Sequence, residues 1–213
     1  MTAPLQVRTL VDQAYELVRG RILSGEIAPG APIRQDGLAE TLGVSKIPVR
    51  EALGRLEQDG LLSSHPNRGY VVRPMTADEA AEIFDLRLKI EPAATAEGAR
   101  RATAAERDHA AMLLARLEAE PSAAEAIALN RAFHLALFAP CGEVTNQLLE
   151  RLHVLAERYV RMHLEPTGRR ARARSEHRAL FEAWVGGRSA VVEALTASHI
   201  RATMNDLMGQ LGR

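Results

Sequence analysis

The chain has 213 residues, of which 46% are hydrophobic and 25% are charged, and its formal net charge at pH 7 is +0. This composition is typical of a folded globular protein with room for two small domains, and it excludes a disordered chain. The single cysteine, Cys141, excludes an internal disulfide. No stretch approaches the roughly 20 apolar residues of a membrane span, and the first eight residues contain no apolar run typical of a signal peptide. We therefore expect a cytoplasmic protein without membrane contact.

The first third of the chain alternates short helical patterns with turn residues. A helix is predicted over residues 9–24, where the apolar side chains fall on one stripe, and a short extended segment over residues 31–33. Two more helices are predicted over residues 35–42 and 46–58. We expect Ser45 to cap the second of these by accepting from its first turn, in which Pro48 lacks an N–H group.

The helix over residues 46–58 has a basic N-terminal end and an apolar back. Lys46 and Arg50 are four residues apart and share one face, whereas Val49, Leu53 and Leu56 face a core. A helix that enters the major groove of DNA needs this distribution, and a neutral protein can provide it because groove binding requires only a local basic patch. Residues 35–58 are therefore predicted to form a helix–turn–helix that reads DNA.

A hairpin is predicted directly after this motif. Its strands cover residues 61–64 and 70–73, and the segment His65 to Gly69 between them has the composition of a turn. Two short strands with a basic tip after a recognition helix form a wing. Residues 5–74 are therefore predicted to be a winged helix–turn–helix DNA-binding domain.

From Thr76 onward the apolar residues recur with a period near 3.6, and no strand pattern is present. Capping-box patterns at Thr76–Glu79 and Thr103–Glu106 begin the first two helices, which we expect to end near residues 101 and 119. Four more are predicted over residues 121–140, 143–164, 169–185 and 189–210. The fold class is thus mainly α, with an antiparallel six-helix bundle over residues 76–211.

The predicted bundle contains a pattern of potential metal ligands. Asn130 and His134 lie one turn apart on one helix, His177 lies on the fifth helix of the bundle and His199 on the sixth. One oxygen and three imidazole ligands could surround a divalent metal and leave positions open for water. The alternative is that each histidine is a structural residue, which is the usual role of an isolated histidine on an apolar helix.

The N-terminal domain contains several motif segments: Leu38-Ala39-Glu40, Gly43-Val44-Ser45, Pro48-Val49-Arg50-Glu51-Ala52-Leu53, Leu56-Glu57, Asp59-Gly60-Leu61 and Asn67-Arg68-Gly69. With these segments it resembles the GntR family of bacterial transcription regulators. By this resemblance, the residues expected to approach DNA are Arg34, Gln35, Ser45, Lys46 and Arg50, with His65, Asn67, Arg68 and Gly69 at the wing tip.

For Lys46 and Arg50, the sequence bears on the kind of contact that each can make. Lys46 stands where the family usually has arginine, and it lacks the two-pronged fork of arginine, so we expect looser or different base recognition. For Arg50, the alternative to DNA contact is an ion pair with Glu51 or Glu57 on a solvated helix.

In the bundle, the segments Asn130-Arg131-Ala132-Phe133-His134 and Glu176-His177 and the final His199 resemble the ligand pattern of the FadR C-terminal (FCD) domain, in its six-helix, vanillate-regulator-like variant. The resemblance implies a divalent metal ion (Zn, Ni or Mn) bound by Asn130, His134, His177 and His199. Asn130 stands where aspartate is usual. Because this set carries no negative charge, we expect weaker cation binding and readier acceptance of an anion.

Arg87, on the first bundle helix, has a second implied role. The resemblance suggests that it helps to hold the carboxylate of an effector, whereas its spacing equally allows an i, i+4 pair with Glu91. Arg158 and Arg161 are weaker candidates for the effector role, and we expect them at the surface.

Taken together, the patterns predict a ligand-responsive repressor of a catabolic or transport operon, with no catalytic residues. Its expected partners are double-stranded operator DNA, a small carboxylate effector and a second copy of itself, since such operators are usually two-fold. Two alternatives stay open: a metal-dependent hydrolase fused to a DNA-binding module, and a helical dimerisation domain with structural histidines. Against the hydrolase, Glu176 should point about 100° away from His177 around the helix, which leaves no obvious general base.

Overall fold

The computed structural model describes residues 9–66, 69–164 and 169–211. The chain divides into two compact units, Met1–Pro74 and Met75–Arg213. No helix in the described ranges is both long enough and apolar enough to span a membrane.

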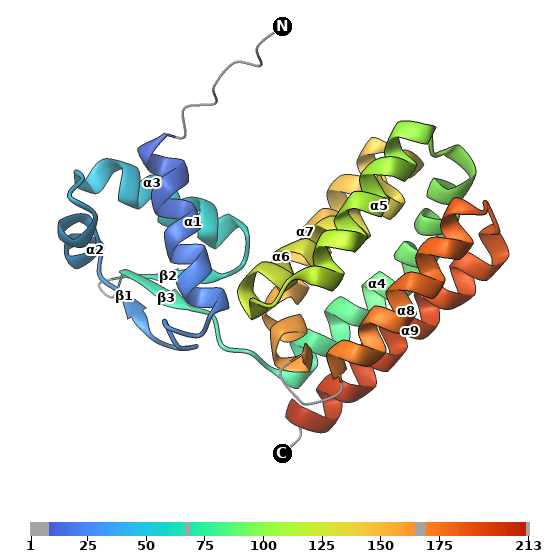
Figure 1. Cartoon of the computed structure of the whole chain (residues 1–213). Helices are drawn as coiled ribbons and strands as arrows, with labels where there is room; N and C mark the ends of the chain where they lie inside the picture. The colour runs from blue at the N-terminus through green and yellow to red at the C-terminus, as the bar shows by residue number, and fades with distance from the viewer. Residues whose placement is uncertain (1–8, 67–68, 165–168, 212–213) are drawn as a thin grey trace, which may run out of the picture. The chain divides into compact units, whose positions relative to one another are not determined.

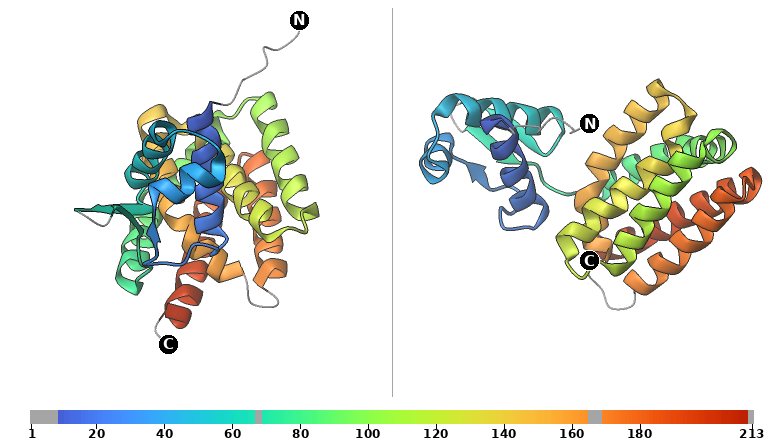
Figure 2. Two further views of the ribbon diagram at one scale, coloured as in Figure 1. Left: turned by 90° about the vertical axis from the view of Figure 1, so that its left-hand side faces the viewer. Right: turned by 45° about the horizontal axis from the view of Figure 1, so that its top comes forward.

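The first unit is the winged helix–turn–helix that the sequence predicts. It consists of α1 (Leu10–Leu23), β1 (Pro32–Ile33), α2 (Gln35–Leu42), α3 (Lys46–Gln58), β2 (Leu62–His65) and β3 (Gly69–Val72) (Figure 1). The strands form an antiparallel sheet in the order β1-β3-β2, with Leu62 opposite Val72 and His65 opposite Gly69. The β2–β3 hairpin extends from the helices of this unit as a wing (Figure 2).

The apolar core of the first unit fixes the position of α3. Its buried members come from all three helices, the strands and the residue before β2: Val18, Ile22, Ile33, Leu38, Ala39, Val49, Leu53, Leu56, Leu61, Leu62 and Val72. Gly43 ends α2 with a φ of 64°, a left-handed conformation that glycine adopts without steric cost. This turn directs the first residues of α3 to solvent while its apolar back stays in the core.

The expected capping role of Ser45 is wrong. Ser45 occupies the N-cap position of α3 with an extended backbone, but its side chain makes no capping hydrogen bond. An N-cap side chain accepts from the second or third residue of a helix, and the third residue here is Pro48, which has no N–H group. The Ser45 hydroxyl therefore does not stabilise the helix end and stays exposed.

The second unit contains the predicted six helices: α4 (Ala77–Arg101), α5 (Ala104–Ala119), α6 (Ala123–Phe138), α7 (Glu143–Leu164), α8 (Arg169–Val185) and α9 (Ser189–Leu211). A short 3₁₀ helix, η1 (Ala139–Cys141), follows α6, so that helix ends two residues earlier than expected. In Figure 1, α5, α6 and α7 lie on one side of the bundle, and α8 and α9 lie on the other beside α4. Large buried side chains such as Phe84, Phe133, Tyr159 and Trp184 fill the interior.

The first helix of the bundle is capped differently from the expectation. Thr76 accepts from the backbone N–H of Glu79, as in a capping box, at 3.1 Å. The Glu79 carboxylate does not return to the backbone of Thr76. Instead it accepts from the Tyr159 hydroxyl of α7 at 2.6 Å, and the backbone N–H of Thr76 donates to the same hydroxyl at 3.2 Å. The complete capping box is found at Thr103–Glu106.

Helices α4 and α6 approach each other closely at Gly98. A Cβ atom at this position would lie 2.1 Å from the carbonyl oxygen of Leu137, so only glycine fits. The same carbonyl accepts a hydrogen bond from Trp184 Nε1 of α8 at 2.9 Å. These two contacts fix the C-terminal end of α6, the helix that carries Asn130 and His134.

Candidate metal centre and DNA-reading surface

The two basic residues at the start of α3 are both exposed, but their surroundings differ. Lys46 Nζ lies 2.9 Å from Asp36 Oδ1 of α2 in an ion pair whose side chains are 66% and 76% exposed. Within the described residues, Arg50 makes no ion pair with Glu51 or Glu57, so the alternative interpretation of Arg50 has no support in the fold. Arg50 is thus the cation on this helix that is free to bind DNA.

The other expected DNA contacts lie at the start of α2 and on the wing. Arg34 is the exposed N-cap residue of α2, and Gln35 is its first helical residue. His65 is exposed at the end of β2, and Gly69 starts β3 with a φ of 71°. The remaining two wing residues, Asn67 and Arg68, lie outside the described residues.

Three histidines from three helices converge inside the second unit. One ligand nitrogen each of His134 (α6), His177 (α8) and His199 (α9) lies within 4.8 Å of the others. The ring centroids are 5.1 Å apart for His134 and His177, and 4.8 Å apart for His177 and His199. His134 and His177 are buried, and His199 is partly exposed. The fold therefore brings together the three imidazoles that the sequence places far apart.

The donor atoms of this cluster fit a divalent metal. Within the described residues, His177 Nε2 is buried and has no hydrogen-bond partner, a state that costs about 1–3 kcal/mol unless something binds it. His199 Nδ1 lies 2.6 Å from Glu176 Oε2, so the carboxylate holds the proton-bearing side of that ring. Histidine ligands of metals commonly have such a carboxylate on their other nitrogen, which leaves Nε2 of His199 for the ion.

Glu176 contacts the histidine cluster through α9, which the sequence does not indicate. Glu176 does leave α8 in a different direction from His177, but α9 packs on that side and presents His199 to it. Arg172 Nε lies 3.5 Å from Glu176 Oε1, and the same guanidinium pairs with Asp206 of α9. Glu176 therefore orients a histidine within an ion-pair network, and it is not a free general base.

Burial favours the neutral form of two imidazoles in the cluster, His134 and His177. Burial lowers the pKa of His134 well below its ordinary value, and the neighbouring His177 and His199 lower it further. Burial, followed by His199, has the same effect on the pKa of His177. Neutral imidazole is the form that binds a metal, so burial favours this form at His134 and His177.

A cavity adjoins the histidines. It contains about 340 Å³ of empty space, part of it open to solvent, and its lining includes Arg87, Asn130, His134, His199 and Thr203. Asn130 is partly exposed and one helical turn from His134, so it faces the same cavity. Asn130 is the only member of the expected ligand set whose ligand atom is an oxygen.

Arg87 forms the ion pair that its spacing allows, and its role toward an effector stays a prediction. Its Nε and Nη2 donate to the Glu91 carboxylate at 2.8 and 3.2 Å, which is the i, i+4 pair that the spacing allows. Both residues are buried, with 4% and 0% of their surface exposed. Arg87 also lines the cavity, but its charge is already neutralised by a bidentate partner.

His153 of α7 belongs to no sequence motif, yet it takes part in this network. Its Nε2 lies 3.1 Å from Glu91 Oε2, and its ring centroid lies 5.6 Å from that of His134. Although desolvation by burial opposes ionisation, Arg87 and then His153 hold the pKa of Glu91 well below its ordinary value. Only the packing of α7 against α4 reveals this residue, because nothing in its local sequence is distinctive.

The expectation for Arg158 is wrong, since this residue is only 5% exposed. Its Nη2 lies 3.3 Å from Glu79 Oε2 at the start of α4. Arg158 joins the group that fixes the N-terminal end of α4 to α7, and Arg161 is partly exposed. A long arginine on an amphipathic helix can be buried when a carboxylate faces it, which the sequence of α7 alone does not show.

Comparisons with known proteins agree with this arrangement. The chain matches the FCD domain family over residues 82–202 and the family described as bacterial regulatory proteins, gntR family, over residues 10–72. It is 33% identical over 153 residues to the HTH-type transcriptional repressor GlaR of Escherichia coli K12, covering 68% of this chain and 70% of that protein. It is 37% identical over 79 residues to the uncharacterised HTH-type transcriptional regulator YdhC of Bacillus subtilis, which is 37% of this chain but only 35% of the relative.

The fold has a solved counterpart in McbR/YncC of Escherichia coli, with a TM-score of 0.80 and 24% sequence identity over 96% of this chain and 99% of that one. The matched families and relatives are transcription regulators and not enzymes, which decides against the hydrolase alternative. The chain therefore belongs to the bacterial GntR family, with an FCD domain as its second unit, and is a DNA-binding transcription regulator.

Proposed function

We propose that this regulator is a repressor that senses a small organic acid through a divalent metal ion held by His134, His177, His199 and the amide oxygen of Asn130. The observation that carries the proposal is the buried His177 Nε2, which has no hydrogen-bond partner among the described residues and lies near two further imidazoles beside a cavity. When bound, the metal supplies a Lewis-acidic position for a carboxylate oxygen. A ligand set of mostly imidazole nitrogens suits zinc or nickel better than manganese.

The residues around the ligands prepare the site for an anion. Glu176 orients His199, and Glu91 is neutralised by Arg87, so no free carboxylate on these residues repels an acid in the cavity. Asn130 contributes an oxygen without a charge. A site of three neutral imidazoles and one amide keeps the full positive charge of the cation available to the effector.

The effector signal passes through the helices that carry the ligands. His134, His177 and His199 lie on α6, α8 and α9, so an acid that binds among them favours one packing of these helices over another. A ligand with different affinities for two packings shifts the protein between them. We expect this shift to change operator affinity, with the chain acting as a homodimer on a two-fold site.

Metal analysis of the purified protein tests the proposal. We expect about one divalent metal per chain, lost in His177→Ala together with any thermal stabilisation by small carboxylates such as acetate or lactate. Operator binding by His177→Ala should persist, because the first unit has its own core. His109→Ala, an exposed histidine on α5, is the matched control and should keep both properties.

If the protein contains no stoichiometric metal, and a chelator changes neither its melting temperature nor its response to acids, the proposal is wrong. The histidines would then be structural residues of a helical dimerisation domain. Light scattering measures the state of assembly independently of the metal.

A further inference from the structure

Four arginines at the start of α8 separate into two groups with different surroundings. Arg169 and Arg172 both pair with Asp206 of α9, and this pairing directs them to one side of the helix. Arg170 and Arg174, one turn apart, lie on the other side, towards α5 and α6. A stretch that the sequence presents as uniform basic surface therefore has one neutralised face and one basic face.

The basic face borders a groove between α5, α6 and α8. The groove contains about 350 Å³ of empty space, part of it open to solvent, and its walls are mostly apolar. Its lining residues are Leu117, Glu120, Ala126, Asn130, Arg170, Ala173, Arg174 and His177. It is a cleft with an apolar wall and charged groups at specific places, which is the usual form of a small-molecule site.

This groove leads to the metal centre. His177 lines it directly, and both Asn130 and Ala173 line the groove as well as the cavity beside His134 and His199. The small side chain of Ala173 and the amide of Asn130 are thus common to the two spaces. A ligand bound at the histidines could extend into the groove past these two residues.

The charge of the groove is positive. In the part of the chain that the structure describes, the exposed Arg174 makes no hydrogen bond or ion pair, and Arg170 donates only to the carbonyl oxygen of Pro121 at 3.4 Å. Glu120 is the opposing charge, and its carboxylate accepts from the backbone N–H of Ser122 at 2.9 Å. Two guanidinium groups against one carboxylate leave a net attraction for anions, and arginine binds carboxylates through two parallel hydrogen bonds.

Arg87 and Arg174 differ in whether a carboxylate neutralises their charge. Arg87 lies in the cavity but is already paired with Glu91, whereas Arg174 carries an unneutralised charge at the groove. The cation best placed to bind the far end of an elongated acid is therefore Arg174.

We infer that the groove is a second compartment of the effector site and that Arg174 binds a second acidic group, so that the effector is a dicarboxylate with a short apolar middle. The inference rests on the proposed function, because the first carboxylate is placed at the histidines. It adds the class of effector and a specificity residue outside the ligand set.

Binding of two matched series of acids to the metal-loaded full-length protein tests this inference. Calorimetric titration would use the dicarboxylates malonate, succinate, glutarate, adipate and suberate, and the monocarboxylates propionate, butyrate, valerate, hexanoate and octanoate. We expect at least one dicarboxylate to bind tenfold or more tightly than the monocarboxylate of equal length. Arg174→Gln should abolish that preference while metal content, melting temperature and monocarboxylate binding stay unchanged.

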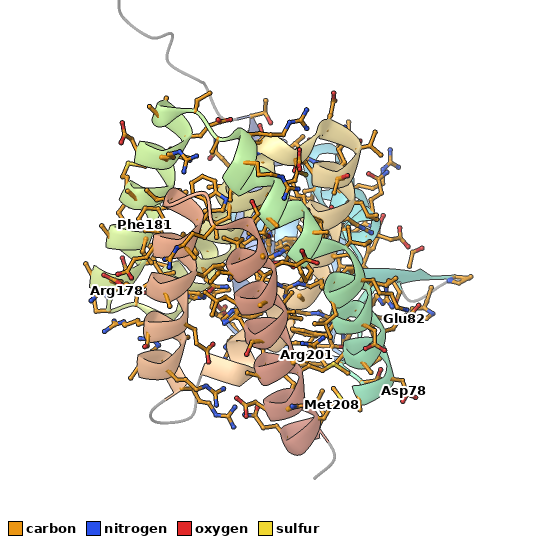
Figure 3. The ribbon with its side chains drawn as sticks, turned by 90° about the vertical axis from the view of Figure 1, so that its right-hand side faces the viewer. Asp78, Glu82, Arg178, Phe181, Arg201 and Met208 are labelled. Atoms are coloured by element: carbon orange, nitrogen blue, oxygen red, sulfur yellow. The ribbon has the colours of Figure 1, made fainter. Side chains whose placement is uncertain are left out.

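Arg201→Gln is the matched control, since Arg201 is an exposed arginine on α9 (Figure 3) and lines neither the groove nor the cavity. It should bind both series as the unaltered protein does. If monocarboxylates bind to the metal-loaded protein as tightly as dicarboxylates, or if Arg174→Gln keeps the preference, the second compartment is wrong and the metal site stands. If neither series binds even though the metal is present, both the compartment and the acid-sensing function are wrong.

Discussion

Arg50 and Lys46 occupy neighbouring turns of α3, but only Arg50 is without an ionic partner within the described residues. We expect Arg50→Ala to weaken binding to a specific operator by roughly 1–3 kcal/mol, because a base contact in the major groove is lost. Fluorescence anisotropy with an operator selected from random DNA measures this change. An unaltered affinity would exclude Arg50 from the groove, and Arg116→Ala, an exposed arginine on α5, controls for loss of charge alone.

For the ion pair of Lys46 we predict a variant that binds DNA more tightly. Its ammonium pairs with Asp36 in an exposed and therefore weak ion pair. Asp36→Asn should strengthen DNA binding, because Lys46 is released and a negative charge near the phosphates is removed. The dependence of log K on log salt should become steeper by about one unit, the effect of one further phosphate contact. Glu40→Gln changes a second exposed carboxylate on α2 as a control, and equal effects of the two variants would contradict a specific role for the pair.

The buried histidines predict how the stability of the metal-free protein depends on pH. Burial is the largest cause of the lowered pKa values of His134, His153 and His177, whose ordinary value is 6.5. As pH falls below about 6.5, the unfolded chain binds protons that the folded chain does not, so the free energy of unfolding decreases. Each histidine contributes up to about 1.4 kcal/mol per pH unit in this range. Glu91 adds to the loss at pH values below 4.5, because its pKa is held low in the fold.

Urea unfolding of chelator-treated protein between pH 8 and pH 5 checks this dependence. His153→Gln should make the slope shallower by removing one buried imidazole that is not in the ligand set. His109→Gln, which replaces an exposed histidine on α5, is the matched control. A stability that is constant from pH 7 to pH 5 would contradict the burial of neutral histidines.

At the level of whole elements, the packing of α4 against α6 leaves no room for a side chain at Gly98. Gly98→Ala should destabilise this unit by about 1–3 kcal/mol, since the new methyl group would meet the backbone of Leu137. Gly209→Ala is the matched control on α9, where no atom lies within 4 Å of an added Cβ. It should stabilise the protein by up to about 1 kcal/mol through helix propensity.

Unfolding of these variants is readily followed through the fluorescence of Trp184, the single tryptophan of the chain. Its indole donates to the carbonyl of Leu137, so it reports on the same contact that Gly98 makes. A Gly98→Ala variant as stable as Gly209→Ala would show that α4 and α6 can separate without cost.

At the scale of the whole molecule, the division into two units predicts two thermal transitions. Each unit has its own apolar core. A ligand at 100 times its dissociation constant raises the free energy of unfolding of the unit that binds it by about 2.7 kcal/mol, and so raises its melting temperature. Calorimetry should therefore show one transition that operator DNA raises and another that a chelator lowers. A single transition that responds equally to both additions would mean that the units unfold together.

The sequence by itself determined the elements of this protein and the candidate residues of its two proposed sites. The bounds of α2, α3 and α7 agree with the periodicity and turn residues, because these signals act between residues a few positions apart. The same local spacing identified Arg50 on the exposed face of α3, and it identified the histidines as candidates to be tested by their positions in the fold.

Only the tertiary structure decided which helix faces pack against one another. Glu91 and His153, or Glu176 and His199, come from different helices, and periodicity shows which face of a helix is buried but not which helix covers it. For the same reason, the sequence does not show that the α8 arginines form two groups. Asp206 of α9 neutralises one group, whereas Arg174 faces the groove. Helix periodicity is a short-range property of the backbone, whereas the partner of a buried charge is set by packing across the bundle, so the candidate histidines were predictable and their surroundings were not.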